Sequence, residues 1–161
     1  MTKVIIISDT HYCSIERLSA NLLNKLKEAD IVVHAGDADT LNFIDELNKI
    51  CKSLYAVKGN CDIGSTLPLK LVEQIEGIKI GVSHGTGNYN NIIDRLYYMF
   101  SDDNPDIIIY GHTHVPINED IEGIHFINPG STTLNRTLNN GTYALLTIDG
   151  NNFNATIENA D

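Results

Sequence analysis

Val4-Ile5-Ile6-Ile7-Ser8-Asp9-Thr10-His11, close to the start of the chain, places an apolar run directly before an acidic and an imidazole side chain. The run Val4–Ile7 is short, β-branched and uninterrupted, which is typical of a strand buried on both faces of a sheet. In open α/β sheets, ligands bind at the carboxyl ends of the parallel strands. Asp9 and His11 therefore mark this strand end as a candidate site within an α/β fold.

The sequence after this strand alternates between strand and helix patterns. Apolar runs predict further strands at Ile31–His34, Leu54–Val57 and Ile107–Tyr110. Helical spacing predicts three helices, with Ser14 as the candidate cap of the first and Asp39 or Thr40 of the second. Their apolar faces are formed by Ile15, Leu18, Leu22 and Leu26, by Leu41, Ile44, Leu47 and Ile50, and by Ile92, Leu96 and Phe100.

Short strands around turns dominate from Val115 onward. They are expected at Val115–Glu119, Ile124–Ile127, Tyr143–Ile148 and Phe153–Ile157, after an earlier hairpin formed by Leu69–Ile75 and Ile78–Val82. Strand–helix–strand units followed by an antiparallel meander fit two sheets packed together with helices outside. No repeat or linker interrupts the chain, so residues 1–161 are expected to form a single domain.

The composition of the chain is that of an ordinary globular protein. Among 161 residues, 42% are hydrophobic and 20% are charged, which excludes a disordered chain and a collagen-like fibre. No apolar run approaches the ~18 residues that span a membrane, and the apolar start is too short for a signal peptide. We therefore expect no membrane association and a cytoplasmic location.

Charge and cysteine content narrow the partners and the metal chemistry. Against 11 basic side chains stand 21 acidic ones, a net charge of −10, so long-range repulsion disfavours binding to nucleic acid. The three cysteines, Cys13, Cys51 and Cys61, are odd in number and have no CxxC spacing. A disulfide framework and a cysteine-based zinc site are therefore not expected.

Five predicted strand ends carry polar residues of the kinds that bind metal ions. The segments are Asp9-Thr10-His11, Gly36-Asp37, Gly59-Asn60-Cys61-Asp62, His84-Gly85 and Gly111-His112-Thr113-His114. Carboxylates, an amide carbonyl and imidazoles suit borderline divalent ions such as Mn²⁺, Fe²⁺, Zn²⁺, Ni²⁺ or Co²⁺. Each residue alone is explained as a turn, cap or hydrogen-bonded residue, but the five segments together favour a metal site. Seven candidate ligands exceed the needs of one tetrahedral ion and suit two ions that share a carboxylate.

These segments, in this order, resemble the motif set of the calcineurin-like metallophosphoesterases. The short chain, Cys61 in the third motif and Asn128-Pro129-Gly130-Ser131 are similar to the YfcE-like small phosphodiesterases of bacteria and archaea. The resemblance extends from Asp9 to Arg136. It implies a four-layer α/β/β/α sandwich of two mixed β-sheets flanked by helices, and a phosphodiesterase that acts on small phosphodiesters through a dinuclear metal centre.

The resemblance also implies a role for each motif residue. One ion would be bound by Asp9, His11 and His114, the other by Asn60, His84 and His112, and Asp37 would bridge the two. A metal-bound hydroxide would attack the phosphorus, while the ions, Mn²⁺ by preference, and Asn60 would stabilise the phosphoryl charge. Asp37, Asn60 and His84 are accordingly the candidate catalytic residues.

Three positions differ from the pattern of the wider family. Cys61 stands where that family has a histidine, its supposed general acid, and a thiol with a pKa of ~8.5 is a poor substitute. The role of Asp62, which would orient that histidine, is then open, and substrates with good leaving groups should be favoured. Tyr12 and Thr86 replace a glycine and a histidine, and both changes would alter the shape of the pocket rather than the ligand set.

The remaining polar residues and the tyrosine cluster have plainer explanations. His34 is expected to pack or to support a ligand, and His125 to be a strand residue. Arg136 is a candidate contact for substrate phosphate, with a surface salt bridge as the alternative. The cluster Tyr97-Tyr98-Met99-Phe100 is expected in the core or at a contact between copies in a homo-oligomer.

Two other functions stay open at the level of sequence. A non-catalytic, protein-binding subunit of the retromer type would share the fold, although such subunits have lost ligand residues and all seven are present here. A phosphomonoesterase or a nuclease would use the same site. Hydrolysis of a diester, a monoester and single-stranded DNA would separate these possibilities.

Overall fold

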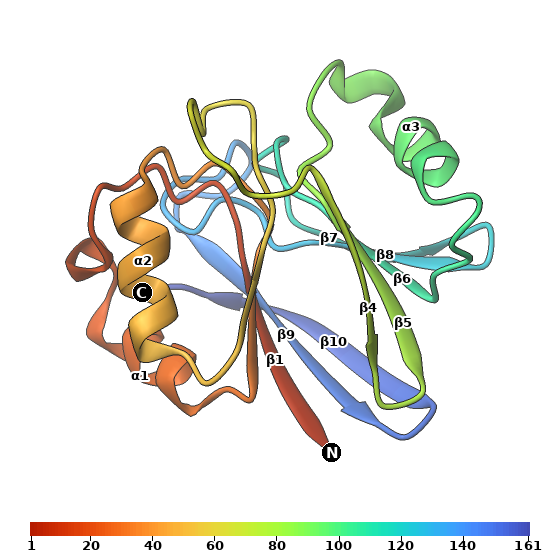
Figure 1. Cartoon of the computed structure of the whole chain (residues 1–161), viewed down its shortest axis with the longest axis horizontal. Helices are drawn as coiled ribbons and strands as arrows, with labels where there is room; N and C mark the ends of the chain where they lie inside the picture. The colour runs from red at the N-terminus through yellow and green to blue at the C-terminus, as the bar shows by residue number, and fades with distance from the viewer.

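The computed structural model describes residues 1–161 and contains two five-stranded sheets (Figure 1). The first sheet has the strand order β10-β9-β1-β2-β3. Its members are β1 (Thr2–Ile7), β2 (Ile31–His34), β3 (Leu54–Ala56), β9 (Thr142–Asp149) and β10 (Asn152–Asn159). β1, β2 and β3 are parallel, β9 is antiparallel to β1, and β10 is antiparallel to β9, so the sheet is mixed.

The second sheet has the order β4-β5-β6-β8-β7 and is also mixed. Its members are β4 (Lys70–Ile75), β5 (Ile78–Ser83), β6 (Ile107–Ile109), β7 (Ile117–Ile121) and β8 (Ile124–Asn128). β5, β6 and β8 run parallel in the middle, and β4 and β7 pair antiparallel at the two edges. Each sheet therefore contains three parallel strands, and the carboxyl ends of these strands lie on the same side of the sandwich (Figure 1).

The burial of β1 explains why its sequence is apolar at successive positions. Val4 and Ile6 lie in the core between the two sheets, whereas Ile5 and Ile7 lie beneath the helices. Successive side chains of a strand point to opposite faces, so a strand that is covered on both sides needs apolar residues throughout. The uninterrupted run Val4–Ile7 thus places β1 in the middle of two packed layers.

Three helices cover the outer faces of the sheets. They are α1 (Ala20–Glu28), α2 (Leu41–Ile50) and α3 (Ile92–Met99). α1 and α2 pack on the first sheet through residues such as Leu22 and Phe43, and α3 packs on the second sheet through Leu96. The layer order is helix, sheet, sheet, helix, which confirms the predicted α/β/β/α sandwich (Figure 1). None of the helices has the length and apolar character needed to cross a membrane.

The first helix differs from its prediction because it is divided. Ser14 caps only the short 3-10 helix η1 (Ile15–Arg17), and Leu18 is extended. Ser19 then caps α1: its side chain accepts a hydrogen bond from the Leu22 N–H, and its hydroxyl donates to the Ala160 carbonyl at 2.6 Å. This contact joins residues 141 positions apart, so helical spacing alone could not indicate where α1 begins. By contrast, Thr40 caps α2 as predicted.

The last four strands form two hairpins rather than one meander. β7 pairs with β8 in the second sheet, and β9 pairs with β10 in the first. β8 is parallel to β6, and residues 129–141 carry the chain from one sheet to the other. Alternating strand patterns and turns locate strands, but they do not specify which sheet each strand joins, and the prediction of a continuous meander was wrong for this reason.

The tyrosine cluster at the end of α3 is divided between core and surface. Phe100 is fully buried with Ile108 of the second sheet, whereas the side chain of Tyr98 is 82% exposed. The cluster is therefore only partly core, and a contact between copies through its exposed residues stays a prediction.

Candidate metal centre

The loops that follow β1, β2, β3, β5 and β6 meet on one side of the sandwich and carry the seven predicted ligands (Figure 1). Ligand atoms of Asp9, His11 and His114 all lie within 4.8 Å of one another. The same holds for Asp9, Asp37 and His84, so Asp9 belongs to both groups. The fold thus brings together side chains that are far apart in the sequence.

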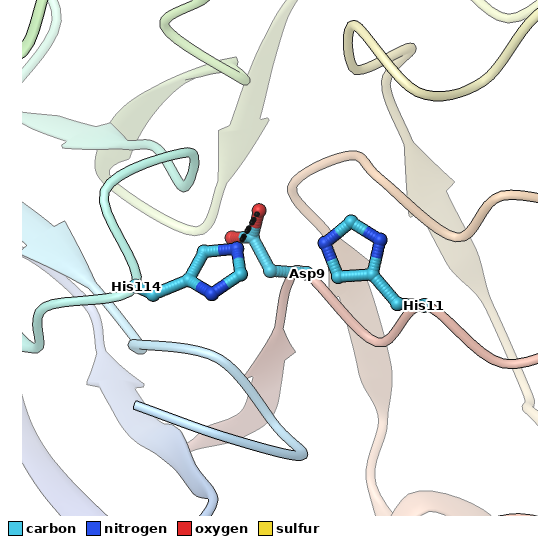
Figure 2. Close-up of side chains that lie close together, drawn as sticks. All are labelled: Asp9, His11 and His114. Atoms are coloured by element: carbon cyan, nitrogen blue, oxygen red, sulfur yellow. Dashed lines mark ion pairs between the residues drawn. The ribbon is translucent and has the colours of Figure 1, made fainter. Parts of the chain in front are cut away.

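Asp9 is the most enclosed of these residues, with no exposed surface. Its Oδ2 accepts hydrogen bonds from the Ser8 hydroxyl (2.6 Å) and the His112 backbone N–H (3.0 Å). Its Oδ1 is buried and has no hydrogen-bond partner, although His114 Nε2 lies 3.2 Å and His84 Nε2 3.8 Å from it. Figure 2 shows this carboxylate between the His11 and His114 rings. Asp9 Oδ2 is therefore engaged in hydrogen bonds within the protein, whereas Oδ1 is free to bind a ligand.

Asp37 is a member of the second group and also lies near His11 of the first. Its Oδ1 accepts from the Cys61 backbone N–H at 2.8 Å, and its Oδ2 lies 3.2 Å from His84 Nε2 and 4.0 Å from His11 Nε2. Burial by itself would raise the pKa of Asp37, but the hydrogen bonds from His84 and Cys61 outweigh burial and lower that pKa. Asp37 is consequently an ionised carboxylate within reach of imidazoles from both sides.

His11 is oriented by Asp39, a residue for which the sequence predicted only a role as a candidate helix cap. The ring atom Nδ1 of His11 lies 2.8 Å from Asp39 Oδ1. A carboxylate at one ring nitrogen fixes the tautomer and directs the other nitrogen, Nε2, toward Asp37. The alternate spacing of Asp37 and Asp39 was the available signal, because both follow the same strand. Asp39 therefore belongs to the candidate centre as a support for His11.

His84 and Asn60 come from the two sheets and meet across the site. His84 Nδ1 bonds to the Ala35 carbonyl at 2.7 Å, and its Nε2 lies 3.1 Å from Asn60 Oδ1. Burial disfavours the charged form of His84, but the hydrogen bond to Asp37 and the charges of Asp9 and Asp37 outweigh burial and raise its pKa. The Nε2 edge of His84 thus faces three ligand oxygens.

His112 and His114 follow β6 and have different partners. His114 faces Asp9, as described above, while His112 Nε2 lies 2.8 Å from the Gly87 carbonyl, to which it donates. This leaves Nδ1 as the free ring nitrogen of His112. Burial lowers the pKa of His112 against the opposing effect of the Gly87 carbonyl, which favours the neutral imidazole that binds metal ions.

The backbone of these loops adopts an unusual conformation at the site residues. Positive φ angles between 47° and 71° occur at Asp9, His11, Asp37, Asp39, His112 and His114. Such angles cost of order 1–3 kcal/mol each for residues other than glycine and persist where the surroundings impose them. Gly59 contributes to that constraint, because a Cβ at this position would lie 2.1 Å from Asp37 Oδ1. The surroundings of these loops therefore impose a backbone conformation that is unfavourable for the isolated residues.

Cys61 and Asp62 complete the third loop. Burial, together with the nearby Asp37 carboxylate, raises the pKa of the Cys61 thiol to about 11, so the thiol stays protonated at neutral pH. Asp62 accepts three backbone hydrogen bonds of 2.8–2.9 Å, from Asp37, Asp39 and Gly59. Asp62 thus holds two ligand loops together. This structural role is independent of whether position 61 is a histidine.

Further hydrogen bonds hold the ligand loops from the side that faces away from the centre. Asn128 donates to the Gly111 carbonyl (2.9 Å), and the Ser131 hydroxyl donates to the Asp9 carbonyl (2.8 Å). His34 is fully buried and interacts with the Thr10 hydroxyl at 3.0 Å. Burial lowers the pKa of His34 to about 4, so its ring is neutral. The turn at residues 128–131 and His34 thus support the ligand loops, a role that the sequence predicted for His34.

Three predicted residues lie apart from this cluster. Tyr12 packs against the core beneath the helices and lies under the Arg17 guanidinium, 5.3 Å from ring centre to carbon. Arg136 donates to the Tyr89 hydroxyl (2.8 Å) instead of forming the alternative salt bridge, and Tyr89 in turn packs edge-on to the His112 ring at 4.9 Å. His125 lies in strand β8, as predicted. Arg136 is thus linked to the site through Tyr89, and Tyr12 is not.

The donor set and the unpaired oxygen together test whether the residues fit divalent metal ions. Leaving a buried polar atom without a partner costs about 1–3 kcal/mol, and more for a charged group. Asp9 Oδ1 carries this cost unless a cation binds beside it. Carboxylates and imidazoles within 4.8 Å of one another are suitable ligands for such a cation. The residues present therefore fit a metal centre.

Comparison with known proteins assigns the family. Residues 2–151 match the calcineurin-like phosphoesterase superfamily domain, and the chain belongs to this superfamily. A probable metallophosphoesterase of Methanocaldococcus jannaschii is 37% identical over 134 residues, which cover 81% of this chain and 68% of the relative. The phosphodiesterase YfcE of Escherichia coli K12 is 28% identical over 120 residues, or 65% of this chain and 58% of that protein. The predicted membership of the calcineurin-like superfamily is confirmed, and a YfcE phosphodiesterase is among the relatives.

A solved structure with a different name shares the fold. Vacuolar protein sorting 29 of Cryptosporidium parvum aligns with a TM-score of 0.78 at 21% identity, covering 98% of this chain and 96% of that one. At this identity the similarity establishes the architecture and carries no information about activity.

Proposed function

We propose that this protein is a metal-dependent phosphodiesterase that hydrolyses small phosphodiesters at a centre of two divalent ions. The observation that carries the proposal is that His11, His114, Asp37 and His84 gather around the Asp9 carboxylate, whose buried Oδ1 has no hydrogen-bond partner, while Asn60 and His112 lie beside His84. The phosphodiesterase name of a YfcE relative supports a diester as substrate. A cytoplasmic location accompanies the proposal as an expectation.

The seven side chains divide into two sets around Asp37. Asp9, His11 and His114 would hold one ion, Asn60, His84 and His112 would hold the other, and Asp37 would contact both. Mn²⁺ is the expected metal, and Ni²⁺, Co²⁺, Fe²⁺ and Zn²⁺ suit the same donor atoms. When bound, such ions activate water and neutralise charge on a phosphoryl group.

The residues of the chain would position the substrate and determine whether the leaving group is protonated. Asn60 places a side-chain amide beside the phosphoryl site, and its Nδ2 lies 3.5 Å from the Cys61 sulfur. The raised pKa of Cys61 makes it a poor acid for leaving-group protonation. We therefore expect diesters with acidic, easily released alcohols to react fastest. Arg136, next to Tyr89, is the candidate cationic contact for the substrate.

The test is hydrolysis of bis-p-nitrophenyl phosphate by chelator-stripped protein before and after addition of Mn²⁺. Its leaving group needs little protonation, so a site without a strong general acid should still act on it. Activity that appears only with metal supports the proposal. The monoester p-nitrophenyl phosphate and single-stranded DNA serve as comparison substrates, and a preference for either would replace the diesterase by a phosphomonoesterase or nuclease.

A non-catalytic protein-binding subunit is the second candidate, because vacuolar protein sorting 29 shares the fold over nearly the whole chain. Such a protein would hydrolyse none of the three substrates in any metal-loaded form. Complete inactivity of folded protein with Mn²⁺, Ni²⁺, Co²⁺ and Zn²⁺ would favour this alternative. Circular dichroism and a cooperative thermal transition would establish that the inactive protein is folded.

A further inference from the structure

Arg95, on α3, holds the loop that follows β5. Its guanidinium donates to three backbone carbonyls of that loop: Asn88 at 2.6 Å, and Gly85 and Thr86 at 3.1 Å each. It also donates to the Asn91 side-chain carbonyl. A planar guanidinium with five donors can satisfy several acceptors at fixed angles, which an ammonium group cannot. One side chain thus holds four acceptors within residues 85–91.

Gly87 lies within this loop and connects it to the candidate centre. Its carbonyl accepts the hydrogen bond from His112 Nε2 at 2.8 Å. Its φ of +121° is accessible to glycine, and a Cβ here would lie 3.0 Å from Arg95 Nη2. The carbonyls before and after Gly87 are both bonded to Arg95. The direction of the Gly87 carbonyl therefore follows from the position of the guanidinium.

The hydrogen bond from His112 to Gly87 selects one form of the imidazole. A neutral ring that donates from Nε2 carries its lone pair on Nδ1, and such a partner beyond the ligand usually sets both tautomer and orientation. His112 has other contacts: its backbone N–H donates to Asp9 Oδ2, and the Tyr89 and His84 rings pack edge-on to its imidazole at 4.9 and 5.2 Å. The first contact fixes the backbone and the ring contacts restrict the imidazole, but the Gly87 carbonyl is the group that accepts its Nε2–H.

We infer that Arg95 is a positioning residue for the metal centre: through the Gly87 carbonyl it holds the His112 ring with Nδ1 free to bind an ion. The inference rests on the metal site of the proposed function. Arg95 lies beside Ile92 on the helix but does not belong to the core cluster, in which Ile92 and Leu96 pack α3 against the second sheet. Its loss should therefore loosen the loop while the helix stays in place.

The test compares Arg95→Met and Arg95→Lys with Lys27→Met. Lys27 is exposed on α1, so Lys27→Met removes the same charge at a position without a contact to the site. Nitrogen-15 spectra of the imidazoles in metal-free protein, at a pH where His112 is neutral, report its tautomer. Titration with Mn²⁺ reports the two binding steps. Neither readout requires catalysis.

We expect the wild type and Lys27→Met to show the Nε2–H form of His112, and Arg95→Met to show a mixture of both forms. In Arg95→Met one Mn²⁺ step should weaken about 10-fold, at the low end of losses measured for groups that orient ligands. Arg95→Lys should fall between, because it keeps the charge but not the four hydrogen bonds. An unchanged tautomer together with unchanged Mn²⁺ affinities in Arg95→Met would overturn the inference.

A second variant, Gly87→Ala, keeps the inference testable if Arg95→Met fails to fold. Gly87→Ala strains the backbone at a φ of +121° and displaces the same carbonyl while Arg95 remains. If Arg95→Met fails to fold, Gly87→Ala must show the mixed tautomer, and retention of the Nε2–H form would overturn the inference. If wild-type protein binds no Mn²⁺, the proposed function fails, and the tautomer in metal-free variants still decides whether Arg95 orients His112.

Discussion

The two halves of the candidate centre differ in how far they are prepared for an ion. In the half formed by Asp9, His11 and His114, one carboxylate oxygen is buried without a hydrogen bond, and His11 is held from behind by Asp39. In the other half, His84 Nε2 already contacts Asn60 and Asp37 at 3.1 and 3.2 Å. The first half thus keeps a buried oxygen without a hydrogen bond, whereas in the second half the ligand atoms of His84, Asn60 and Asp37 already contact one another.

This difference has a consequence for the order of binding. An ion that enters the first half relieves an oxygen that has no hydrogen bond, and the only contact of that oxygen it must replace in this half is the ion pair of Asp9 with His114 at 3.2 Å. An ion that enters the second half must separate His84 from its hydrogen-bond partners and compete with the proton that its raised pKa favours. We therefore expect the first half to bind the tighter ion, and four substitutions test the comparison.

Asp37→Asn should have the largest effect, because Asp37 Oδ2 faces imidazoles of both halves. We expect the value of kcat/KM for bis-p-nitrophenyl phosphate to fall about 1000-fold, or ~4 kcal/mol of transition-state stabilisation. Both Mn²⁺ binding steps should weaken. The asparagine can still accept the Cys61 hydrogen bond, so the fold should persist. Activity at the wild-type level would contradict the assignment of Asp37 to both ions.

Asp9→Asn should remove the response of the protein to the tighter ion. At 100 times its dissociation constant a ligand adds ~2.7 kcal/mol to the free energy of unfolding, and this increment should largely disappear in the variant. In metal-free protein the same change should raise the free energy of unfolding by about 1 kcal/mol, because an amide replaces an unpaired buried carboxylate oxygen. Urea denaturation with and without Mn²⁺ measures both. Equal stabilisation of wild type and variant by Mn²⁺ would place the tighter ion elsewhere.

Asp39→Asn should weaken the tighter Mn²⁺ step about 10-fold, because it removes the carboxylate that orients His11. Asp45→Asn is the matched control: Asp45 is exposed on α2 and loses the same charge without a contact to a ligand. Calorimetric titration distinguishes the two steps. Equal losses in both variants would show that net charge, rather than the orientation of His11, accounts for the change.

Cys61→His should have the smallest effect. Imidazole is a better acid than a thiol whose pKa is about 11, so hydrolysis of diesters with poor leaving groups should rise a few-fold, well below the ~100-fold or more that a well-positioned general acid supplies. The gain is small because Asp62, which would orient a histidine here, already accepts three backbone hydrogen bonds. A series of leaving groups of increasing pKa measures the effect. Identical rates for both proteins across the series would mean that position 61 delivers no proton.

Prediction from sequence succeeded where the signal was local. The strand at Ile31–His34 and the Thr40 cap follow from short patterns, and the structure has both. It failed where a distant contact overrode the pattern. Ser19, whose hydroxyl donates a hydrogen bond to the Ala160 carbonyl, caps α1, and β9 joins the first sheet although β8, the strand before it, lies in the second.

The amino-acid sequence by itself determined the α/β class, the position of the site after the strands, and the seven side chains that could bind ions. These three features depend on residue type and on short-range periodicity, which are local properties of the sequence and do not require a folded chain. Only the tertiary structure decided that Asp9 keeps one oxygen unpaired, that Asp39 supports His11, and that Arg95 reaches His112 through Gly87. Hydrogen-bond partners of this kind come from segments far apart in the chain, and only folding sets their distances.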